Sequence, residues 1–544
     1  MLKNKEFLIK YLPYIFALGL FIILLAAGLY LYKDFGVPVD EPYQLELAIK
    51  NHRYIFDRDP ELLSDQDRYH GAIVELPLFW VATRFAGPEK VYIRHLLLYL
   101  AFLAGLAIFY FLSLKLFRNQ WWALLNLCML AASPRIFSDA FYNSKDVVFM
   151  DMFILAIWTL ILLIDGLKKK RRRLVINALV VFHSIASSLL IATRVTGIVI
   201  IPLSLTLLVF AELESKNFWK ESSKVIILYL ALAASLIVLF WPILWHDPLE
   251  EFINAFHQMS KYLEYGKGVL YRGELIPSDA LPWHYLPVWI GISTPVIILA
   301  GFIPGLVSWI RSIDISAGKG KIHRAEDIIR WISQLETLNW LAVVGWLSIP
   351  LIAVFWFHPV FYNGWRHMFF IYPALVIFSV RGYYALHKWL SQKTGRFIEV
   401  TIVTVLVLIV GLAEPIEFLR YYHQYGIVYF NQLAGDPKTI RQRYETDYWG
   451  LSYKEAIDYI LDTNSSEKIP VYMADVSGLD YINSALSSEQ KARIVNLDSP
   501  DNGARYFIGN FEFHPGDYEY SKLSREYYSL VVRGIKILVI YQFH

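Results

Sequence analysis

Acidic and basic residues stand next to several long apolar runs of this sequence. Asp40 and Glu41 follow the first run, Lys145 and Asp146 open a later one, and Arg194 interrupts apolar sequence on both sides. A carboxylate can act as a general base on a hydroxyl group, whereas arginine and lysine bind phosphate. Together these residue types predict chemistry on a phosphorylated substrate that needs one base and several cations.

A second set of residues is expected to complete this site. Arg366 and His367 lie in a short turn between two apolar runs, and we expect both to contact the phosphate. Candidates for binding an acceptor or a sugar ring are Asp139, Tyr43, Tyr362 and Trp365.

Each candidate also has a purely structural explanation. Asp40 precedes Glu41 and Pro42, a pattern typical of a helix N-cap with an acidic first turn. The cations can extend toward lipid head groups, and the aromatic residues can belong to the belts at the membrane interface. For Asp40 the two roles are compatible, because a cap can hold a catalytic side chain in place.

The elements that must position these residues are membrane-spanning helices. Of the 544 residues, 56% are hydrophobic and only 18% are charged, whereas soluble proteins average about 25% charged residues. The apolar residues are concentrated in runs of about 17–25 residues, the length that crosses a bilayer. We predict 11 spans, at 11–31, 91–117, 121–137, 147–167, 174–193, 195–210, 225–245, 284–310, 338–356, 368–386 and 397–413.

This composition excludes several classes of protein. A soluble enzyme, a disordered chain and a coiled coil do not have such apolar runs. The net charge of +3 gives no sign of nucleic-acid binding. The single cysteine, Cys128, excludes an intramolecular disulfide and a cysteine-based metal framework.

The basic loops predict the orientation. Six consecutive cations at 168–173 place the loop after the fourth span in the cytoplasm. The N-terminus and the basic loops 216–224, 311–330 and 387–396 then also lie in the cytoplasm. All candidate site residues fall on the opposite face, and an odd number of spans places the C-terminal part there as well.

The predicted fold class is therefore an all-α polytopic protein of the cytoplasmic membrane with a small C-terminal α/β extracytoplasmic domain. Residues 1–413 form the transmembrane catalytic domain, whose outer loop 32–90 carries interfacial helices, one of them at 71–85. Residues 414–544 form the extracytoplasmic domain. There we predict a capping box at 452–455 that opens a helix, and β-rich runs at 469–473, 492–497, 506–513 and 530–541.

These motifs, in this order and on one face, resemble a GT-C membrane glycosyltransferase of the family 39, protein-mannosyltransferase-like bacterial branch. The resemblance rests on Asp40-Glu41-Pro42, Lys145-Asp146 and Arg194-Val195-Thr196-Gly197, with further similarity in the segments 362–367 and 444–453. It implies a GT-C fold and an inverting transfer of one sugar from a polyprenyl-phosphate donor on the extracytoplasmic face. In that family the residue matching Asp40 is the base, Glu41 is its neighbour, and Asp146 matches an acid that holds the base or the acceptor.

The cations are assigned by their chemistry. A leaving phosphate is stabilised by positive groups, which here would be Arg194, Arg366, Lys145 and His367. No cofactor and no metal site are predicted; a divalent cation is compatible with the reaction but not required. The expected partners are a polyprenyl-phosphate sugar, the lipid bilayer, and a lipid, glycan or protein acceptor that offers a hydroxyl or amine group.

Two other functions stay open on the sequence alone. A transporter or flippase of lipid-linked sugars would also have a cationic, aromatic cavity, although its ionisable groups should lie near the membrane midplane. A non-catalytic membrane scaffold could present the C-terminal domain, and it would tolerate a change of Asp40 to asparagine.

Overall fold

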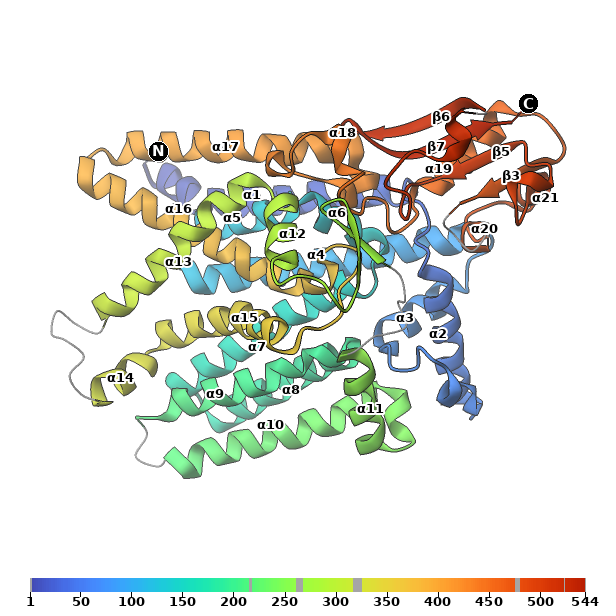
Figure 1. Ribbon diagram of the computed structural model, residues 1–544. Coiled ribbons are helices and arrows are strands. Elements are labelled where there is room, and N and C mark those ends of the chain that lie inside the picture. The colour runs from blue at the N-terminus through green and yellow to red at the C-terminus, as the bar shows by residue number, and fades with distance from the viewer. Residues whose placement is uncertain are drawn as a thin grey trace.

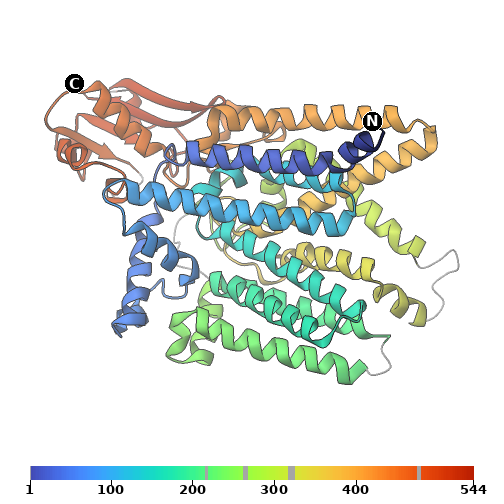
Figure 2. The same cartoon turned by 180° about the vertical axis from the view of Figure 1, so that it is seen from behind.

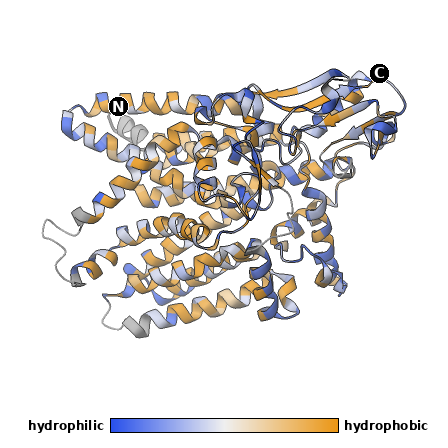
Figure 3. Cartoon of the chain, in the orientation of Figure 1, coloured by the Kyte–Doolittle hydropathy of each residue, from blue (hydrophilic) through white to orange (hydrophobic). Residues whose placement is uncertain are grey.

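The protein is a multi-pass membrane protein. The computed structural model describes residues 2–214, 218–260, 268–316, 325–474, 480–522 and 524–543. Ten helices within these ranges are long and apolar enough to cross a membrane, and they run roughly along one direction, with hydrophobic residues over their surfaces (Figures 1 and 3). They belong to α1 (Leu2–Leu31), α4 (Glu89–Phe117), α7 (Asp146–Lys168), α8 (Arg173–Thr193), α9 (Ile200–Glu212), α10 (Phe218–Phe240), α13 (Val296–Ser316), α15 (Leu335–Phe357), α16 (Tyr372–Thr394) and α17 (Phe397–Tyr422).

Two of the predicted spans are interrupted by proline. The run 121–137 is divided between α5 (Gln120–Ala131) and α6 (Pro134–Tyr142), and the run 284–310 between α12 (Tyr285–Ser293) and α13. Proline lacks the N–H that a helix interior needs, so Pro134 starts a new helix rather than continuing the old one. Pro295 separates α12 from α13 in the same way.

Candidate residues and basic loops lie at opposite ends of the bundle. The helix α7 begins at Asp146 and ends at Lys168, which separates the two ends by about 33 Å. At the end where Asp146 lies, called the site end here, are also α2 (Glu41–Phe56), α3 (Ala72–Ala82) and the C-terminal sheet (Figure 1). With 11 residues, α3 is too short to span a bilayer.

Short helices and one hairpin lie in the remaining connections between the long helices. These connections contain η1 (Pro60–Ser64), η2 (Val195–Val199), η3 (Pro242–Trp245), α11 (Pro248–Ser260), α14 (Ala325–Ile332) and an unpredicted hairpin of β1 (Gly268–Tyr271) and β2 (Glu274–Pro277). Parts of two predicted cytoplasmic loops, residues 215–217 and 317–324, lie outside the described residues.

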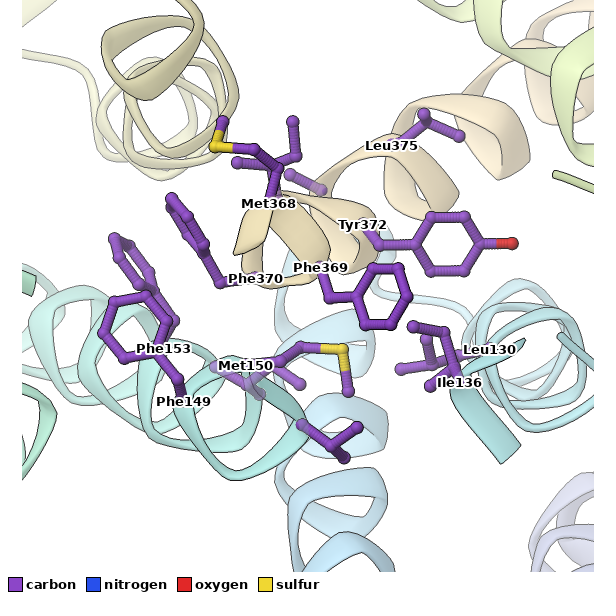
Figure 4. Packing of buried hydrophobic residues seen from close by; sticks show 14 of the residues in the cluster. Leu130, Ile136, Phe149, Met150, Phe153, Met368, Phe369, Phe370, Tyr372 and Leu375 are labelled. Carbon is purple, nitrogen blue, oxygen red and sulfur yellow. The ribbon is translucent and has the colours of Figure 1, made fainter. Parts of the chain in front are cut away.

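The core beneath the site end joins α7 to η5 (Arg366–Ile371). Phe149 and Phe153 of α7 face Phe370 of η5, with ring centroids 5.0 Å apart in both pairs (Figure 4). On another side of the bundle α1 and α4 lie side by side (Figure 2). This packing fixes the start of α7 relative to η5, and these two elements carry Asp146 and Arg366.

The C-terminal domain contains a five-stranded mixed sheet. Its strand order is β4-β3-β5-β7-β6, with β3 parallel to β4 and β5, and β7 antiparallel to β5 and β6. The strands are β3 (Ile469–Met473), β4 (Ile494–Asn496), β5 (Tyr506–Gly509), β6 (Arg525–Val532) and β7 (Ile535–Gln542).

Four runs were predicted as strands, and each of them contains strand. The run 469–473 is confirmed, and 492–497 and 506–513 form the shorter β4 and β5. The β-rich run 530–541 contains the end of β6 and most of β7, joined by a two-residue turn at Arg533 and Gly534, which both have positive φ.

Helices and short 3-10 turns complete the C-terminal part. They are η6 (His423–Val428), η7 (Gln432–Ala434), α18 (Pro437–Ile440), α19 (Ser452–Thr463), α20 (Asp480–Asn483), α21 (Ser488–Arg493), η8 (Pro500–Asn502) and η9 (Glu519–Lys522). The helix α17 continues past residue 413 to Tyr422. The domain boundary after residue 413 stays a prediction.

The predicted capping box at 452–455 is wrong. Ser452 is the first helical residue of α19 rather than its N-cap, and its hydroxyl donates to the carboxylate of Asp447. The same carboxylate accepts the backbone N–H groups of Leu451 and Ser452, at 3.0 and 2.9 Å. Glu455 accepts a hydrogen bond from Tyr528 instead, at 2.6 Å. The helix is therefore capped by an upstream acid, because the chain turns back between 447 and 451.

Candidate active site

Asp40 presents its carboxylate to a cation instead of to its own helix. It occupies the N-cap position of α2, yet within the described part of the chain its side chain accepts no capping hydrogen bond. The carboxylate lies 3.7 Å from Nζ of Lys145, and 32% of the side chain is exposed. The N–H of Gln44 bonds to the backbone carbonyl of Asp40 at 3.0 Å. The helix start thus fixes the backbone and leaves the carboxylate available to accept a proton.

Asp146 holds two arginines together. It is the buried first residue of α7, and its carboxylate pairs with Nη1 of Arg194 and, at 3.0 Å, with Nη1 of Arg366. Asn143 donates to the same carboxylate at 3.1 Å and accepts the N–H of Asp146 at 2.8 Å. Because burying charges is costly without such partners, this arrangement keeps both guanidinium groups at the start of α7.

Aromatic rings fix the planes of these arginines. The guanidinium of Arg366 lies 4.6 Å from the ring of Trp449 and 5.1 Å from the ring of Tyr362, and that of Arg194 lies 5.9 Å from the ring of Phe149. Such contacts attract a cation to the face of the ring. With Lys145, three cations lie near the carboxylates of Asp40 and Asp146.

Glu41 faces a different set of partners from Asp40. It is buried, and its carboxylate lies 3.3 Å from Nε of Arg94 and 3.5 Å from Nε2 of His95. Burial alone would raise the pKa of Glu41, but His95 and Arg94 lower this pKa below its usual range. Arg94 also donates to Glu75 of α3 at 2.9 Å. Glu41 thus joins α2 to α3 and α4 next to the site.

A hydroxyl group connects this network to Lys145. Ser144 donates to Gln44 of α2 at 2.8 Å and also contacts the carboxylate of Glu75. Since Ser144 directly precedes Lys145, the contact holds the start of α7 against the start of α2. This positions the ammonium group of Lys145 beside Asp40.

The other candidates lie at different distances from this cluster. Asp139 lies behind the cluster. Its carboxylate accepts hydrogen bonds from the hydroxyl of Tyr142 at 2.8 Å and from the side-chain amide of Asn143 at 2.9 Å. The same amide also contacts Asp146. Tyr43 is largely exposed on α2. Trp365 is buried, and its indole N–H donates to Ser293 at 2.7 Å, which places its ring in the protein interior.

His367 and Tyr362 lie beside the arginines. Their rings are 4.7 Å apart and T-shaped, and His367 is an electrostatic neighbour of Arg366, Arg194 and Lys145. Within the ranges that the structure describes, Nδ1 of His367, Nε of Arg366 and Nε1 of Trp449 are buried without a hydrogen-bond partner. Buried polar groups are almost always paired, so three such atoms close together are unusual.

Sequence reasoning missed three residues of this site. His70, in the loop before α3, interacts electrostatically with Lys145 and Arg194; burial and these cations lower the pKa of His70, whereas Asp67 raises it. Glu445 and Trp449 come from the C-terminal domain, in a segment noted only for its family resemblance. No motif marks His70, whereas the position of Trp449 within that segment could have indicated a role. Among the described residues, no group of three or more His, Cys, Asp or Glu side chains could hold a metal ion.

Comparison with known proteins identifies the fold. No family model and no curated protein match this sequence. The oligosaccharyltransferase of Archaeoglobus fulgidus, solved with a tethered acceptor peptide, aligns with 93% of this chain and 70% of its own, at 12% identity and a TM-score of 0.53. Its complex with an inhibitory peptide and a dolichol-phosphate, where it is named AglB, aligns with 92% and 70%, at 10% identity and a TM-score of 0.54.

A bacterial structure is also similar. ArnT from Cupriavidus metallidurans, bound to undecaprenyl phosphate, aligns with 96% of this chain and 98% of its own, at 12% identity and a TM-score of 0.43. The chain has the GT-C fold of membrane glycosyltransferases, as the motifs of the sequence predicted.

Proposed function

We propose that this protein is a glycosyltransferase that moves one sugar from a polyprenyl-phosphate donor to a hydroxyl or amine group on the extracytoplasmic face of the cytoplasmic membrane. One observation carries the proposal: the partly exposed carboxylate of Asp40 lies beside Lys145, whose neighbour Asp146 binds Arg194 and Arg366. The fold supports it, because a similar oligosaccharyltransferase was solved with a dolichol-phosphate.

The proposed reaction needs one base and no general acid. The acceptor oxygen attacks C1 of the sugar from the side opposite the phosphate, the bond between C1 and the phosphate oxygen breaks, and the configuration at C1 is inverted. The acceptor proton passes to the carboxylate of Asp40. The polyprenyl phosphate leaves with the bonding electron pair as an anion, which cations can stabilise directly. A glycosidase would instead need two carboxyl groups on either side of the bond.

The charges of the site match this reaction. The donor phosphodiester carries one negative charge, which Arg194, Arg366 and Lys145 can face. During transfer the leaving phosphate gains a second negative charge, and Asp40 becomes neutral as it takes the proton. The site then carries one more positive charge, which balances the charge gained by the phosphate.

The position of the charges favours transfer over transport. Asp146 is the first residue of α7, Arg194 follows the last residue of α8, and Arg366 opens η5. A transporter of lipid-linked sugars would be expected to place such groups near the middle of its spans. A non-catalytic scaffold would have no use for a carboxylate and three cations that converge from distant parts of the chain.

The test is a donor assay. Purified protein is incubated with a panel of polyprenyl-phosphate sugars, and mass spectrometry measures transfer to added acceptors or hydrolysis of the donor. We expect at least one donor to be consumed by the wild type and not by Asp40→Asn. If the wild type neither binds nor consumes any donor, the enzymatic function is contradicted.

A further inference from the structure

A polar segment of the C-terminal domain is buried against the site. Residues 444–452 are all buried, although their sequence, Tyr-Glu-Thr-Asp-Tyr-Trp-Gly-Leu-Ser, contains two acids. We call this segment the strap. It ends at the first residue of α19 and lies between the sheet domain and the helix bundle, so its contacts connect the two.

The strap holds the turn that carries Arg366. Asn363 and Gly364 both have positive φ, at 57° and 69°, so their successive N–H groups point to one side and form an anion-binding nest. The anion is the carboxylate of Glu445, which accepts the N–H of Gly364 at 2.9 Å and also that of Asn363. Two residues after this turn, the guanidinium of Arg366 lies against the ring of Trp449.

The same strap holds the loop that carries Asp40. The N–H of Val39 donates to the carbonyl of Trp449 at 3.0 Å. Three residues earlier, Gly36 lies so close to the strap that a Cβ atom there would approach the carbonyl oxygen of Leu451 to 2.2 Å. The backbone on the N-terminal side of Asp40 is therefore pressed directly against the strap.

We propose that the strap sets the spacing between the base and the phosphate-binding arginine, with Glu445 as the positioning residue for Arg366. The inference rests on the proposed function, because it assigns Asp40 and Arg366 their roles in sugar transfer. It makes the C-terminal domain a part of the active site, since one short segment contacts both the loop of Asp40 and the turn of Arg366.

The chemistry of Glu445 supports a role beyond packing. A buried carboxylate is costly, and a neutral residue would fill the same space at a lower cost in free energy. Burial raises the pKa of Glu445 to about 7, although the N–H groups of Gly364 and Asn363 and the charges of Arg366 and Arg135 lower it. The helix-capping task of the strap is performed by Asp447 instead.

Kinetics with the full-length protein test this positioning. Glu445→Ala should raise the KM for the donor about tenfold, because Arg366 loses its fixed position, and should leave the KM for the acceptor unchanged. Glu445→Gln should stay within about threefold of the wild type, since its amide oxygen can still accept the N–H of Gly364. The matched control is Glu489→Ala, an exposed glutamate of α21 in the same domain, which should change neither constant.

A double-mutant cycle separates positioning from general destabilisation. If Glu445 acts through Arg366, the variant Glu445→Ala/Arg366→Lys should have the donor KM of Arg366→Lys alone. An additional tenfold increase in the double variant would overturn the inference, as would a donor KM for Glu445→Ala equal to that of the wild type.

Amide hydrogen exchange gives a readout that needs no substrate. Glu445→Ala should speed exchange in residues 361–367 of the free protein, whereas Glu489→Ala should not. If the wild type transfers no sugar, the proposed function fails while faster exchange still supports the positioning of this turn. If the wild type is active and exchange in residues 361–367 is the same in both proteins, the inference about the strap fails on its own.

Discussion

The carboxylate of Asp146 accepts a hydrogen bond from Arg366, 220 residues further along the chain, at 3.0 Å. The other oxygen of the same carboxylate pairs with Arg194. One acid at the start of α7 therefore fixes two guanidinium groups from separate helices. Asp40, whose carboxylate lies 3.7 Å from Nζ of Lys145, is the more exposed of these two carboxylates.

Replacing Asp40 should separate binding from turnover. Asp40→Asn keeps the shape of the side chain but cannot accept the proton, so transfer should slow by about 10²–10⁴-fold. Donor affinity should be retained or increased, because a negative charge beside Lys145 is removed. Initial rates and donor binding, measured on the same preparation, check both parts. Asp57→Asn, an exposed aspartate just past the other end of α2, is the control and should be fully active.

Replacing Asp146 should reduce both stability and donor binding. Asp146→Asn leaves two largely buried cations without their shared partner, and breaking such buried pairs costs about 3–5 kcal/mol. Thermal unfolding in detergent should show a clear fall in the midpoint. Asp165→Asn, which removes a more exposed acid from the opposite end of α7, should change the midpoint much less; equal effects would argue against the central position of Asp146.

The geometry of Arg194 should matter as well as its charge. Arg194→Lys keeps the positive charge but loses the planar fork that binds phosphate with two parallel hydrogen bonds. The donor KM should rise about tenfold with a smaller effect on kcat. The comparison is Arg173→Lys, at the other end of α8, for which the donor KM should not change.

Glu445 should give the protein a pH-dependent stability. Its pKa is about 7 in the folded protein and 4.5 ordinarily, so between these values the folded protein holds a proton that the unfolded chain has released. Stability therefore falls as pH rises through this interval. Glu445→Gln cannot ionise and should show a smaller fall in its unfolding midpoint between about pH 5 and about pH 8. Parallel curves for the two proteins would exclude this role of Glu445.

The contact between Gly36 and the strap should not accept a side chain. Gly36→Ala would bring its Cβ against the carbonyl oxygen of Leu451, so the first loop or the strap must move. We expect a marked loss of turnover, with a smaller loss of donor binding because Asp146 still holds both arginines. Gly516→Ala is the matched control, since a Cβ there meets nothing within 4 Å.

The sequence was sufficient to predict the fold and the gathering of the charges. Asp146, Arg194 and Arg366 stand next to the ends of apolar runs and Asp40 lies in the loop after the first run, and span length together with the basic loops predicts that they share one face. Polar side chains at one end of a compact bundle must therefore lie close to one another. The GT-C fold follows from the same order of motifs, and the comparisons with solved structures support it.

The directions of the side chains could not be predicted. Glu41 follows Asp40 directly, yet it points to Arg94 and His95 in the interior. Trp365 precedes Arg366, yet its ring packs in the core. In both cases one step along the backbone changes the partners of the side chain, which depend on tertiary contacts that composition and spacing do not encode.

The role of the strap could not be predicted from the sequence for a related reason. Its contacts join residues that are far apart in the sequence, such as Val39 with Trp449 and Gly364 with Glu445. The sequence Asn363-Gly364 marks a turn with positive φ, but no local pattern names the distant partner of that turn or of a backbone carbonyl. The predicted capping box was wrong for the same reason, because Asp447 and not Ser452 caps the start of α19.

The burial of the strap also bears on how this protein folds. A segment enclosed on one side by the sheet and on the other by the helix bundle cannot be exposed without disturbing both. The two parts should therefore unfold cooperatively in a single transition, and limited proteolysis should not release the sheet as a stable fragment. Membrane insertion of the helices would then be only the first stage of maturation, completed when the last hundred residues dock onto them.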